Sequence, residues 1–253
     1  MLDPNRIWTA ALIVIGDEIL SGRTQDKNVV QVASWLGVQG IRLGEVRVIP
    51  DVEATIVEAV NTLRAKHDYL FTTGGIGPTH DDITVDAVAA ALGVDVVIHP
   101  RARAVLESYY ETRGGLNEGR LRMARVPAGA DLIENRMSGA PGIRIGNLFL
   151  MAGVPHIAAQ MLDALTGTLE GGLPLLSETL GCWVAESEVA GLLRETEHAH
   201  DGASIGSYPF FREGKVGANF VIRSTDPATI SACAGAIVAG LSAIGREIVP
   251  GGI

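Results

Sequence analysis

The sequence has little cysteine, few aromatic residues and a deficit of positive charge, and these scarcities exclude whole classes of protein. Its 253 residues contain two cysteines, Cys182 and Cys233, which lie far apart without the spacing of metal ligands. A disulfide-stabilised secreted domain is therefore not indicated, and we expect two reduced, buried thiols in a cytoplasmic protein. The net charge of −9 leaves no basic patch, which argues against nucleic acid as a partner.

Long hydrophobic runs are also missing. The longest apolar runs, around residues 10–15 and 148–152, are far too short to span a bilayer. Residues 1–5 show neither the basic start nor the hydrophobic stretch of a secretory signal. We therefore expect no membrane partner. What the chain does contain, 47% hydrophobic and 19% charged residues, is typical of a globular protein.

The first two-thirds of the sequence alternate between strand and helix patterns. Buried strand patterns lie at 7–15, 41–49 and 68–72. Amphipathic helix patterns lie at 27–36, 52–63 and 83–92. We expect Asp51 to cap the helix that follows it. This order predicts a parallel sheet with helices on both faces.

The order of strand and helix patterns changes near residue 170, which predicts two domains, 1–170 and 171–253. Before it, the pattern predicts helices at 101–112, 118–124 and 154–169, and a hairpin around Gly146 and Asn147. After it come strands at 175–185, 204–208, 216–224 and 246–249 and helices at 187–196 and 227–244. This second part is a small α+β module, large enough to fold beside the first domain.

The most informative segment is the glycine turn that runs from Thr72 to Asp82. A strand leads into Gly74-Gly75-Ile76-Gly77-Pro78, and a helix pattern follows. Glycines allow the chain to pass close to a ligand, and the first N–H groups of a helix lack internal partners. The turn is thus a candidate cradle for a phosphate. It is neither a P-loop nor a dinucleotide fingerprint, because the required lysine and the third glycine are missing.

Two carboxylates, Asp81 and Asp82, end this turn. Carboxylates beside an anion cradle favour a divalent cation between the protein and the phosphate. Asp82 has an alternative role, since Thr79 to Asp82 has the spacing of a capping box. Asp81 has no such alternative.

A second polar loop follows the first strand, from Ile15 to Asn28. Ligands of open α/β sheets bind beyond the carboxyl ends of the strands, so this loop should lie beside the glycine turn. It carries the acids Asp17, Glu18 and Asp26. For Asp26, capping of the next helix is the better interpretation.

The runs from Gly16 to Asn28 and from Gly74 to Asp82 resemble the molybdopterin-binding-domain (MoaB/MogA-like) superfamily. They are similar in particular to the N-terminal domain of competence/damage-inducible protein A (CinA) and to the molybdopterin-binding-like domain of FAD synthase. The resemblance continues at 140–142, 153–155, 206–209 and 216–219. It implies a MogA-like three-layer α/β sandwich with a mostly parallel sheet, followed by a small α+β domain. It also implies a homo-oligomer, either a dimer or a trimer.

The resemblance further implies either pterin binding or, in the CinA-like branch, hydrolysis of the diphosphate of an FAD- or ADP-ribose-type nucleotide. Our leading hypothesis is such a metal-dependent nucleotide pyrophosphatase. The metal ion, Mg²⁺, Mn²⁺ or Co²⁺, would be held by Asp17, Glu18, Asp81 and Asp82. Asp81 and Asp17 would be catalytic, and His80 would be a proton shuttle unless it is only solvated. The candidate phosphate ligands are Thr73, Gly74, Gly75, Ile76, Gly77, Pro78, Thr79, Asn28, Ser21 and Gly153.

Two other hypotheses remain. The first is adenylyl transfer to a pterin, with molybdopterin as the ligand. The second is a module without catalytic activity that binds a phosphorylated small molecule, because one fold hosts many functions.

Overall fold

The computed structural model describes residues 6–212 and 214–253. The chain divides into two compact units, Met1–Gly172 and Leu173–Ile253, two residues beyond the boundary expected from the sequence. Residues 1–5, in which we expected no secretory signal, lie outside the described residues.

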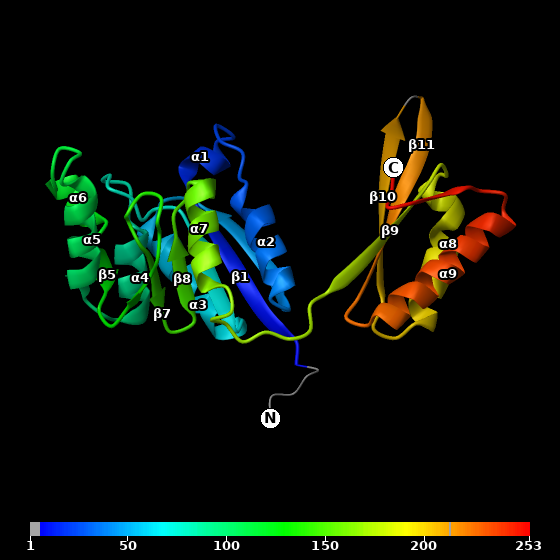
Figure 1. The fold of residues 1–253 in the computed structure, drawn as a ribbon, viewed down its shortest axis with the longest axis horizontal. Helices are drawn as coiled ribbons and strands as arrows, with labels where there is room; N and C mark the ends of the chain where they lie inside the picture. The colour runs from blue at the N-terminus through cyan, green and yellow to red at the C-terminus, as the bar shows by residue number, and fades with distance from the viewer. Residues whose placement is uncertain (1–5, 213) are drawn as a thin grey trace. The chain divides into compact units, whose positions relative to one another are not determined.

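The first unit is built on a mostly parallel sheet with the strand order β2-β1-β3-β8-β7-β6 (Figure 1). β1 is parallel to β2 and β3, and β3 is parallel to β8, whereas β7 and β6 pair antiparallel at one side. The strand bounds are β1 Trp8–Ile15, β2 Ile41–Ile49, β3 Tyr69–Thr73, β6 Asp131–Ile133, β7 Gly142–Ile145 and β8 Leu148–Met151. The predicted α/β fold is thereby confirmed, and the bounds of β2 agree with the sequence pattern.

Helices cover both faces of this sheet. The helices are α1 Asp17–Leu20, α2 Asn28–Val38, α3 Glu53–Lys66, α4 Thr84–Leu92 and α7 Pro155–Leu165. Residues of α3 and α4 share one apolar core with the sheet, and residues of α2 and α7 share the other. The three layers follow from the alternation of side chains along each buried strand.

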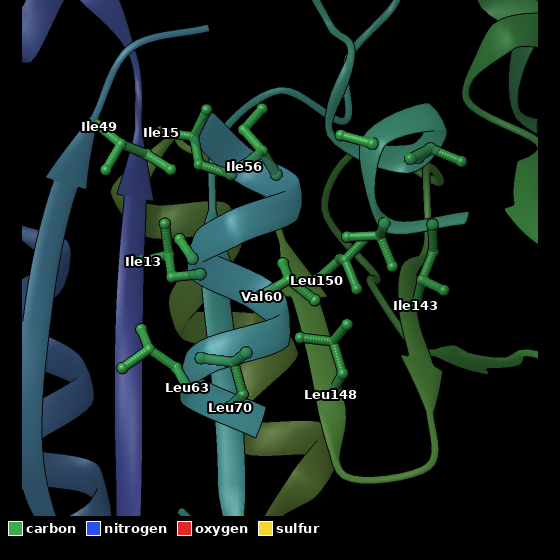
Figure 2. Close-up of a cluster of buried hydrophobic side chains, with 14 of the residues drawn as sticks. Ile13, Ile15, Ile49, Ile56, Val60, Leu63, Leu70, Ile143, Leu148 and Leu150 are labelled. Carbon is green, nitrogen blue, oxygen red and sulfur yellow. The ribbon is translucent and has the colours of Figure 1, made fainter. Parts of the chain in front are cut away.

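The central strand β1 supplies both cores. Its odd-numbered residues Ala11, Ile13 and Ile15 pack towards α3, and its even-numbered residues pack towards α2 and α7. Figure 2 shows Ile13 and Ile15 beside the side chains of α3. Each fully buried aliphatic side chain of this kind stabilises the fold by about 1.5–3 kcal/mol.

A smaller lobe of the first unit comprises α5 Pro100–Tyr110, α6 Glu118–Arg122 and the short antiparallel pair β4 Val96–Ile98 and β5 Arg125–Pro127. It packs around its own small apolar cluster. α6 lies close against the glycine turn, because a Cβ added at Gly119 would be 3.3 Å from the Pro78 carbonyl oxygen. Arg122 Nη2 donates to the carbonyl oxygen of Asp82 at 3.4 Å.

Three local expectations are wrong. Residues Asp17–Leu20, expected in a loop, form the single helical turn α1, which is too short to produce a periodic pattern. Asp51 does not cap α3; its Oδ2 accepts from the Asp17 N–H at 3.0 Å. α7 ends at Leu165 rather than at residue 169, and Gly167 follows it with a φ of +74°.

The second unit is the expected α+β module. Its antiparallel sheet has the order β10-β11-β9-β12, and α8 and α9 share an apolar core with it. The bounds are β9 Leu176–Cys182, α8 Glu186–Ala199, β10 Ser204–Arg212, β11 Lys215–Ser224, α9 Pro227–Ala243 and β12 Ile248–Pro250. The strand β10, which contains Pro209, lies at an edge of this sheet.

Both cysteines belong to the core of the second unit. Cys182 and Cys233 are free and buried, which confirms the prediction of two buried thiols. Burial raises the pKa of each thiol above its usual value. Both are therefore weak nucleophiles.

In the described part of the chain, we find no helix with the length and apolar character needed to cross a bilayer.

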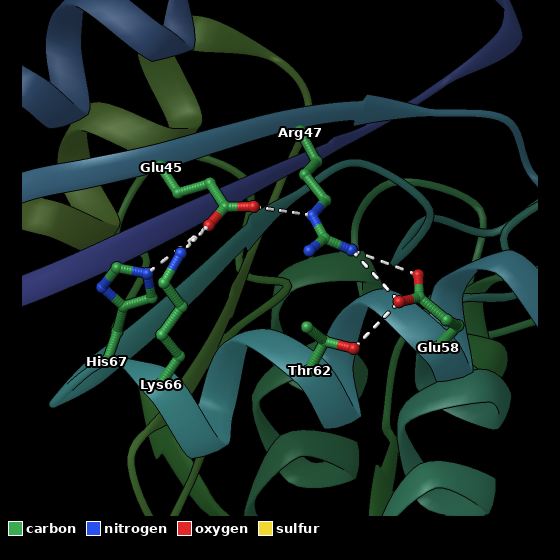
Figure 3. A network of polar contacts seen from close by, with 6 residues as sticks. All are labelled: Glu45, Arg47, Glu58, Thr62, Lys66 and His67. Carbon is green, nitrogen blue, oxygen red and sulfur yellow. Dashed lines mark hydrogen bonds and ion pairs between the residues drawn. The ribbon is translucent and has the colours of Figure 1, made fainter.

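A network of charged side chains lies at the edge of the first sheet, where β2 faces α3 (Figure 3). Glu45 accepts from Lys66 Nζ at 2.7 Å and from Arg47 Nε at 2.9 Å. Arg47 also reaches Glu58, at 3.1 Å. The His67 ring lies 3.8 Å from Glu45 and packs against Gly44, where a Cβ would be 3.1 Å from the ring.

This network predicts a pH-dependent contribution to stability. Hydrogen bonds from Lys66 and Arg47 lower the pKa of Glu45 from 4.5 to about 2. A carboxyl with a lowered pKa in the folded state stabilises the fold above its unfolded pKa and loses that contribution as the pH falls. We expect Glu45→Gln to lower the free energy of unfolding near pH 7, and the difference from the wild type to shrink steadily below pH 4.5.

Urea denaturation at a series of pH values measures this difference. The control is Glu107→Gln, which removes an exposed ion pair with Arg103 and should change stability by less than ~0.5 kcal/mol. A pH-independent effect of Glu45→Gln would contradict the prediction.

Candidate functional site

A cavity of about 590 Å³ lies at the carboxyl ends of β1, β3 and β8. This is the edge of a parallel sheet at which ligands bind in open α/β folds. Among the predicted site residues, the cavity lining includes Glu18, Gly74, Gly75, Ile76, Gly77, Pro78, Asp81, Asp82 and Gly153. The structure therefore brings most of the glycine turn together with Glu18 of the loop that follows the first strand.

The glycine turn takes a backbone path that side chains would block. Gly74 has a φ of +100° and Gly75 a φ of +67°. A Cβ at Gly74 would lie 2.1 Å from the Ile15 carbonyl oxygen, and one at Gly75 would lie 2.1 Å from Thr84 Oγ1. Glycine is needed at both positions for its positive φ and for the close approach of its neighbours.

The turn is anchored at both ends and free in the middle. The Gly74 N–H donates to Met151 O at 3.1 Å, and the Thr84 hydroxyl donates to Gly74 O at 3.0 Å. Within the described residues, the N–H groups of Gly75, Ile76 and Gly77 have no hydrogen-bond acceptor. The three residues line the cavity, and unpaired backbone N–H groups of this kind are the donors that an anion cradle requires.

Asp82 shapes the end of the turn instead of starting a helix. Its Oδ2 accepts from the Thr79 N–H at 2.8 Å and from the Thr79 hydroxyl at 2.5 Å. The contact from the Asp82 side chain back to the Thr79 N–H, which a capping box requires, is thus present. It does not cap a helix, because α4 begins only at Thr84. The missing side chain of Gly77 leaves room for this carboxylate, since a Cβ there would lie 2.6 Å from Asp82 Oδ2.

Asp81 and Glu18 are two further acids of the cavity lining. The nearby Thr79 hydroxyl lowers the pKa of the exposed Asp81 carboxyl. Glu18 folds back over Gly16, where a Cβ would lie 2.5 Å from its carboxylate. Glycines therefore make space for an acid on each side of the cavity.

Asp51 is a site residue that the sequence analysis missed. It follows β2 and lines the cavity together with Glu18, Asp81 and Asp82. Burial raises the pKa of the Asp51 carboxyl, and the neighbouring Asp17, Glu18 and Asp81 charges raise it further. Its position just beyond a predicted buried strand was the available signal, because the carboxyl ends of parallel strands meet at one edge.

Among the described residues, every charged side chain in the cavity lining is acidic. Four carboxylates line it, and no lysine, arginine or histidine belongs to its lining among the described residues. Among residues 6–212 and 214–253, no three His, Cys, Asp or Glu side chains are arranged to hold a metal ion by themselves. The carboxylates still fit a hard divalent cation, because Mg²⁺ is usually held by one or two carboxylates together with substrate phosphates and water.

Asn28 and Thr73 line a second, smaller cavity of about 50 Å³. It adjoins the larger one, since Ile15, Glu18, Thr24, Gly153 and Pro155 line both. Asn28 Nδ2 donates to Gly153 O at 2.8 Å, which leaves its Oδ1 as the free atom. Within the described residues, the Asn28 atom without a partner is therefore an acceptor, while its Nδ2 retains one further hydrogen.

Several predicted site residues lie outside both cavity linings, namely Asp17, Ser21, Thr79 and His80. Asp17 contributes its N–H to Asp51, and the Ser21 hydroxyl donates to Glu18 O at 3.3 Å. The His80 side chain is 99% exposed and lies 4.0 Å from Asp81. Asp26, interpreted as a helix cap, accepts from the Val29 N–H at 2.8 Å in the first turn of α2.

Comparison with protein families gives two matches in order along the chain. Residues 11–171 match the family described as "Probable molybdopterin binding domain". Residues 174–246 match the "FAD synthase, middle domain". The two matched segments correspond to the two structural units.

Curated proteins show similarity over most of the chain. A protein of Aeropyrum pernix is 33% identical over 217 residues, which cover 81% of this chain and 79% of that protein. A "CinA-like protein" of Citrifermentans bemidjiense is 36% identical over 193 residues, which cover 72% of this chain. The match spans only 46% of that longer relative.

Among solved structures, the first unit is similar to "the protein CinA with unknown function from Thermoplasma acidophilum". The identity is 31% and the TM-score 0.59, over 63% of this chain and 96% of that one. The first unit therefore has the MogA/MoaB-like α/β fold that the sequence resemblance implied.

The glycine turn predicts a large effect of one added methyl group. Gly74→Ala combines an unfavourable positive φ with a collision against the Ile15 carbonyl, and we expect it to cost about 3 kcal/mol or more of stability. Gly22→Ala is the matched control, because Gly22 has a φ of +71° and open space around it. Its expected cost is about 1 kcal/mol. Equal losses in urea denaturation would contradict the proposed collision.

The burial of Asp51 among other acids predicts that its ionised carboxylate lowers the stability of the fold. Since the pKa of Asp51 is raised in the folded state, its ionisation disfavours folding above the unfolded pKa. We expect Asp51→Asn to raise the Tm near pH 7, and this gain to vanish as the pH falls to about 4.

Asp26→Ala is the control for this change. It removes an acid from the same region but also the bond to the Val29 N–H, so it should lower stability by about 1 kcal/mol. Thermal unfolding of both variants tests the opposite signs. A lower Tm for Asp51→Asn would show that the carboxylate stabilises the fold.

Proposed function

We infer the function of this chain from the family to which it belongs, the molybdopterin-binding-domain family in its CinA-like branch. We propose that it is a metal-dependent hydrolase of the diphosphate bond in a nucleotide of the FAD or ADP-ribose type. The larger cavity of the first unit is the proposed active site.

The observation that carries this proposal is the presence of free amide donors and carboxylates in one cavity. The N–H groups of Gly75, Ile76 and Gly77 suit phosphoryl oxygens. The carboxylates that share the cavity would repel the same oxygens. A divalent cation between carboxylates and phosphate resolves this conflict, and it is the arrangement that diphosphate chemistry uses.

Each group of the cavity then has a role. A bound metal ion would neutralise the diphosphate and lower the pKa of a coordinated water. Asp81 and one further carboxylate, Glu18 or Asp82, would hold the ion together with phosphate and water, and the free amides would hold the phosphoryl oxygens. Asp51, whose pKa is raised, would accept a proton at the Oδ1 that Asp17 leaves free.

Part of the cavity lining is apolar and suits a flat ring. The apolar lining residues include Met123, Pro141, Ile157 and Met161. An apolar wall beside a polar end is typical of sites for nucleotides and related cofactors. We further propose a cytoplasmic location and a homo-oligomer, a dimer or trimer, which sedimentation would test.

Incubation of the purified protein with FAD and with ADP-ribose tests the proposal. Each reaction contains Mg²⁺, Mn²⁺ or Co²⁺, or EDTA alone, and chromatography separates the products. We expect AMP together with FMN or ribose phosphate in the presence of metal and none with EDTA. Binding of molybdopterin without cleavage of either nucleotide would favour the pterin alternative.

The variant Asp81→Asn separates catalysis from binding. We expect turnover to fall about 100-fold or more, because a metal ligand is lost, while the affinity for the nucleotide changes little. The control is Asp163→Asn, which removes an acid of α7 outside the larger cavity and should leave turnover unchanged. Unchanged turnover in Asp81→Asn would remove this residue from the proposed mechanism.

A further inference from the structure

The small cavity beside the proposed active site contains two buried oxygens without partners. Asn28 is 3% exposed and Thr73 is 1% exposed. Within the described residues, Asn28 Oδ1 and Thr73 Oγ1 have no hydrogen-bond partner. Each such oxygen costs about 1–3 kcal/mol if nothing satisfies it, so a hydrogen-bonding group that enters this cavity and reaches them gains stabilisation.

The chemistry of the two oxygens restricts that group. Asn28 belongs to the cavity lining and its Nδ2 donates to Gly153 O, so its unpartnered atom within the described residues is the acceptor Oδ1. The Thr73 hydroxyl can donate or accept. A phosphate oxygen cannot satisfy Asn28 Oδ1, because both are acceptors. A hydroxyl group satisfies both residues, since it donates to one and accepts from the other.

The position of the cavity connects this hydroxyl with the nucleotide. Ile15, Glu18 and Gly153 line both cavities, so a group that enters the small one extends from a ligand in the large one. A volume of about 50 Å³ admits a hydroxyl and the carbon that carries it, but no aromatic ring.

We propose that the small cavity binds a sugar hydroxyl of the nucleotide, and that Asn28 and Thr73 make the site selective for ribose over deoxyribose. This inference rests on the proposed function in one respect, namely that the ligand is a nucleotide diphosphate. The preceding strand residue supplies a matched control. Thr72 is fully buried and its Oγ1 also lacks a partner among the described residues, but it belongs to the lining of neither cavity.

Calorimetric titration with α,β-methylene ADP and its 2′-deoxy and 3′-deoxy analogues, in the presence of Mg²⁺, tests the proposal. The bridging carbon prevents hydrolysis of the diphosphate. We expect the wild type to bind one of the deoxy analogues about 10- to 100-fold more weakly than the parent compound. In Thr73→Val this ratio should fall to about threefold or less, whereas Thr72→Val and Thr73→Ser should retain it.

Four results would overturn the proposal. They are equal affinities of the wild type for all three compounds, no binding of any of them, an unchanged ratio in Thr73→Val, and a ratio that Thr72→Val removes equally.

The assay of FAD and ADP-ribose hydrolysis keeps this inference separate from the proposed function. Hydrolysis by the wild type without discrimination between the analogues would overturn only the role of Asn28 and Thr73. Discrimination without hydrolysis of any substrate would overturn only the pyrophosphatase.

Discussion

The structure of the site depends on one close approach, between the backbone of Gly74 and the carbonyl of Ile15. No side chain fits at this point, because a Cβ on Gly74 would lie 2.1 Å from the oxygen. Gly153 also packs against Gly74, since a Cβ on Gly153 would be 3.2 Å from Gly74 Cα. The ends of β1, β3 and β8 can therefore converge, and the Gly74 N–H reaches Met151 O across the same junction. The cavity exists because these three loops leave the sheet at nearly the same position.

The second constraint is electrostatic. Acids from the segments after β1, β2 and β3 meet in this cavity without a basic side chain in its lining among the described residues. Burial raises the pKa of Asp51, and the neighbouring acids raise it further. Elsewhere in the same unit, Glu45 has nearby cations and a lowered pKa. The contrast indicates that the uncompensated acids are a property of the site and not of the fold, as is common where a protein binds a cation.

Much of this architecture can be predicted from local sequence. Hydrophobic periodicity predicts the strands and the change in element order near residue 170, and the run of glycines predicts the turn. Both signals are local, because each extends over only a few residues. The role of Asp51 could not be found in this way, because its bond to Asp17 joins residues 34 positions apart. The same holds for Asn28, whose orientation is fixed by a carbonyl 125 positions away. His80 follows the turn in sequence, but it points into solvent because the turn aims Asp81 and Asp82 at the cavity instead.

The edges of the two sheets have a further consequence, for encounters between copies of the chain. β2 carries the charged network of Glu45 and Arg47 at the edge of the first sheet, and β10 carries Pro209 at an edge of the second. Charge and proline both discourage the addition of another strand, because one resists desolvation and the other lacks an N–H group. When copies of this protein meet at high concentration, the edges formed by β2 and β10 are therefore poor templates for a strand of another copy.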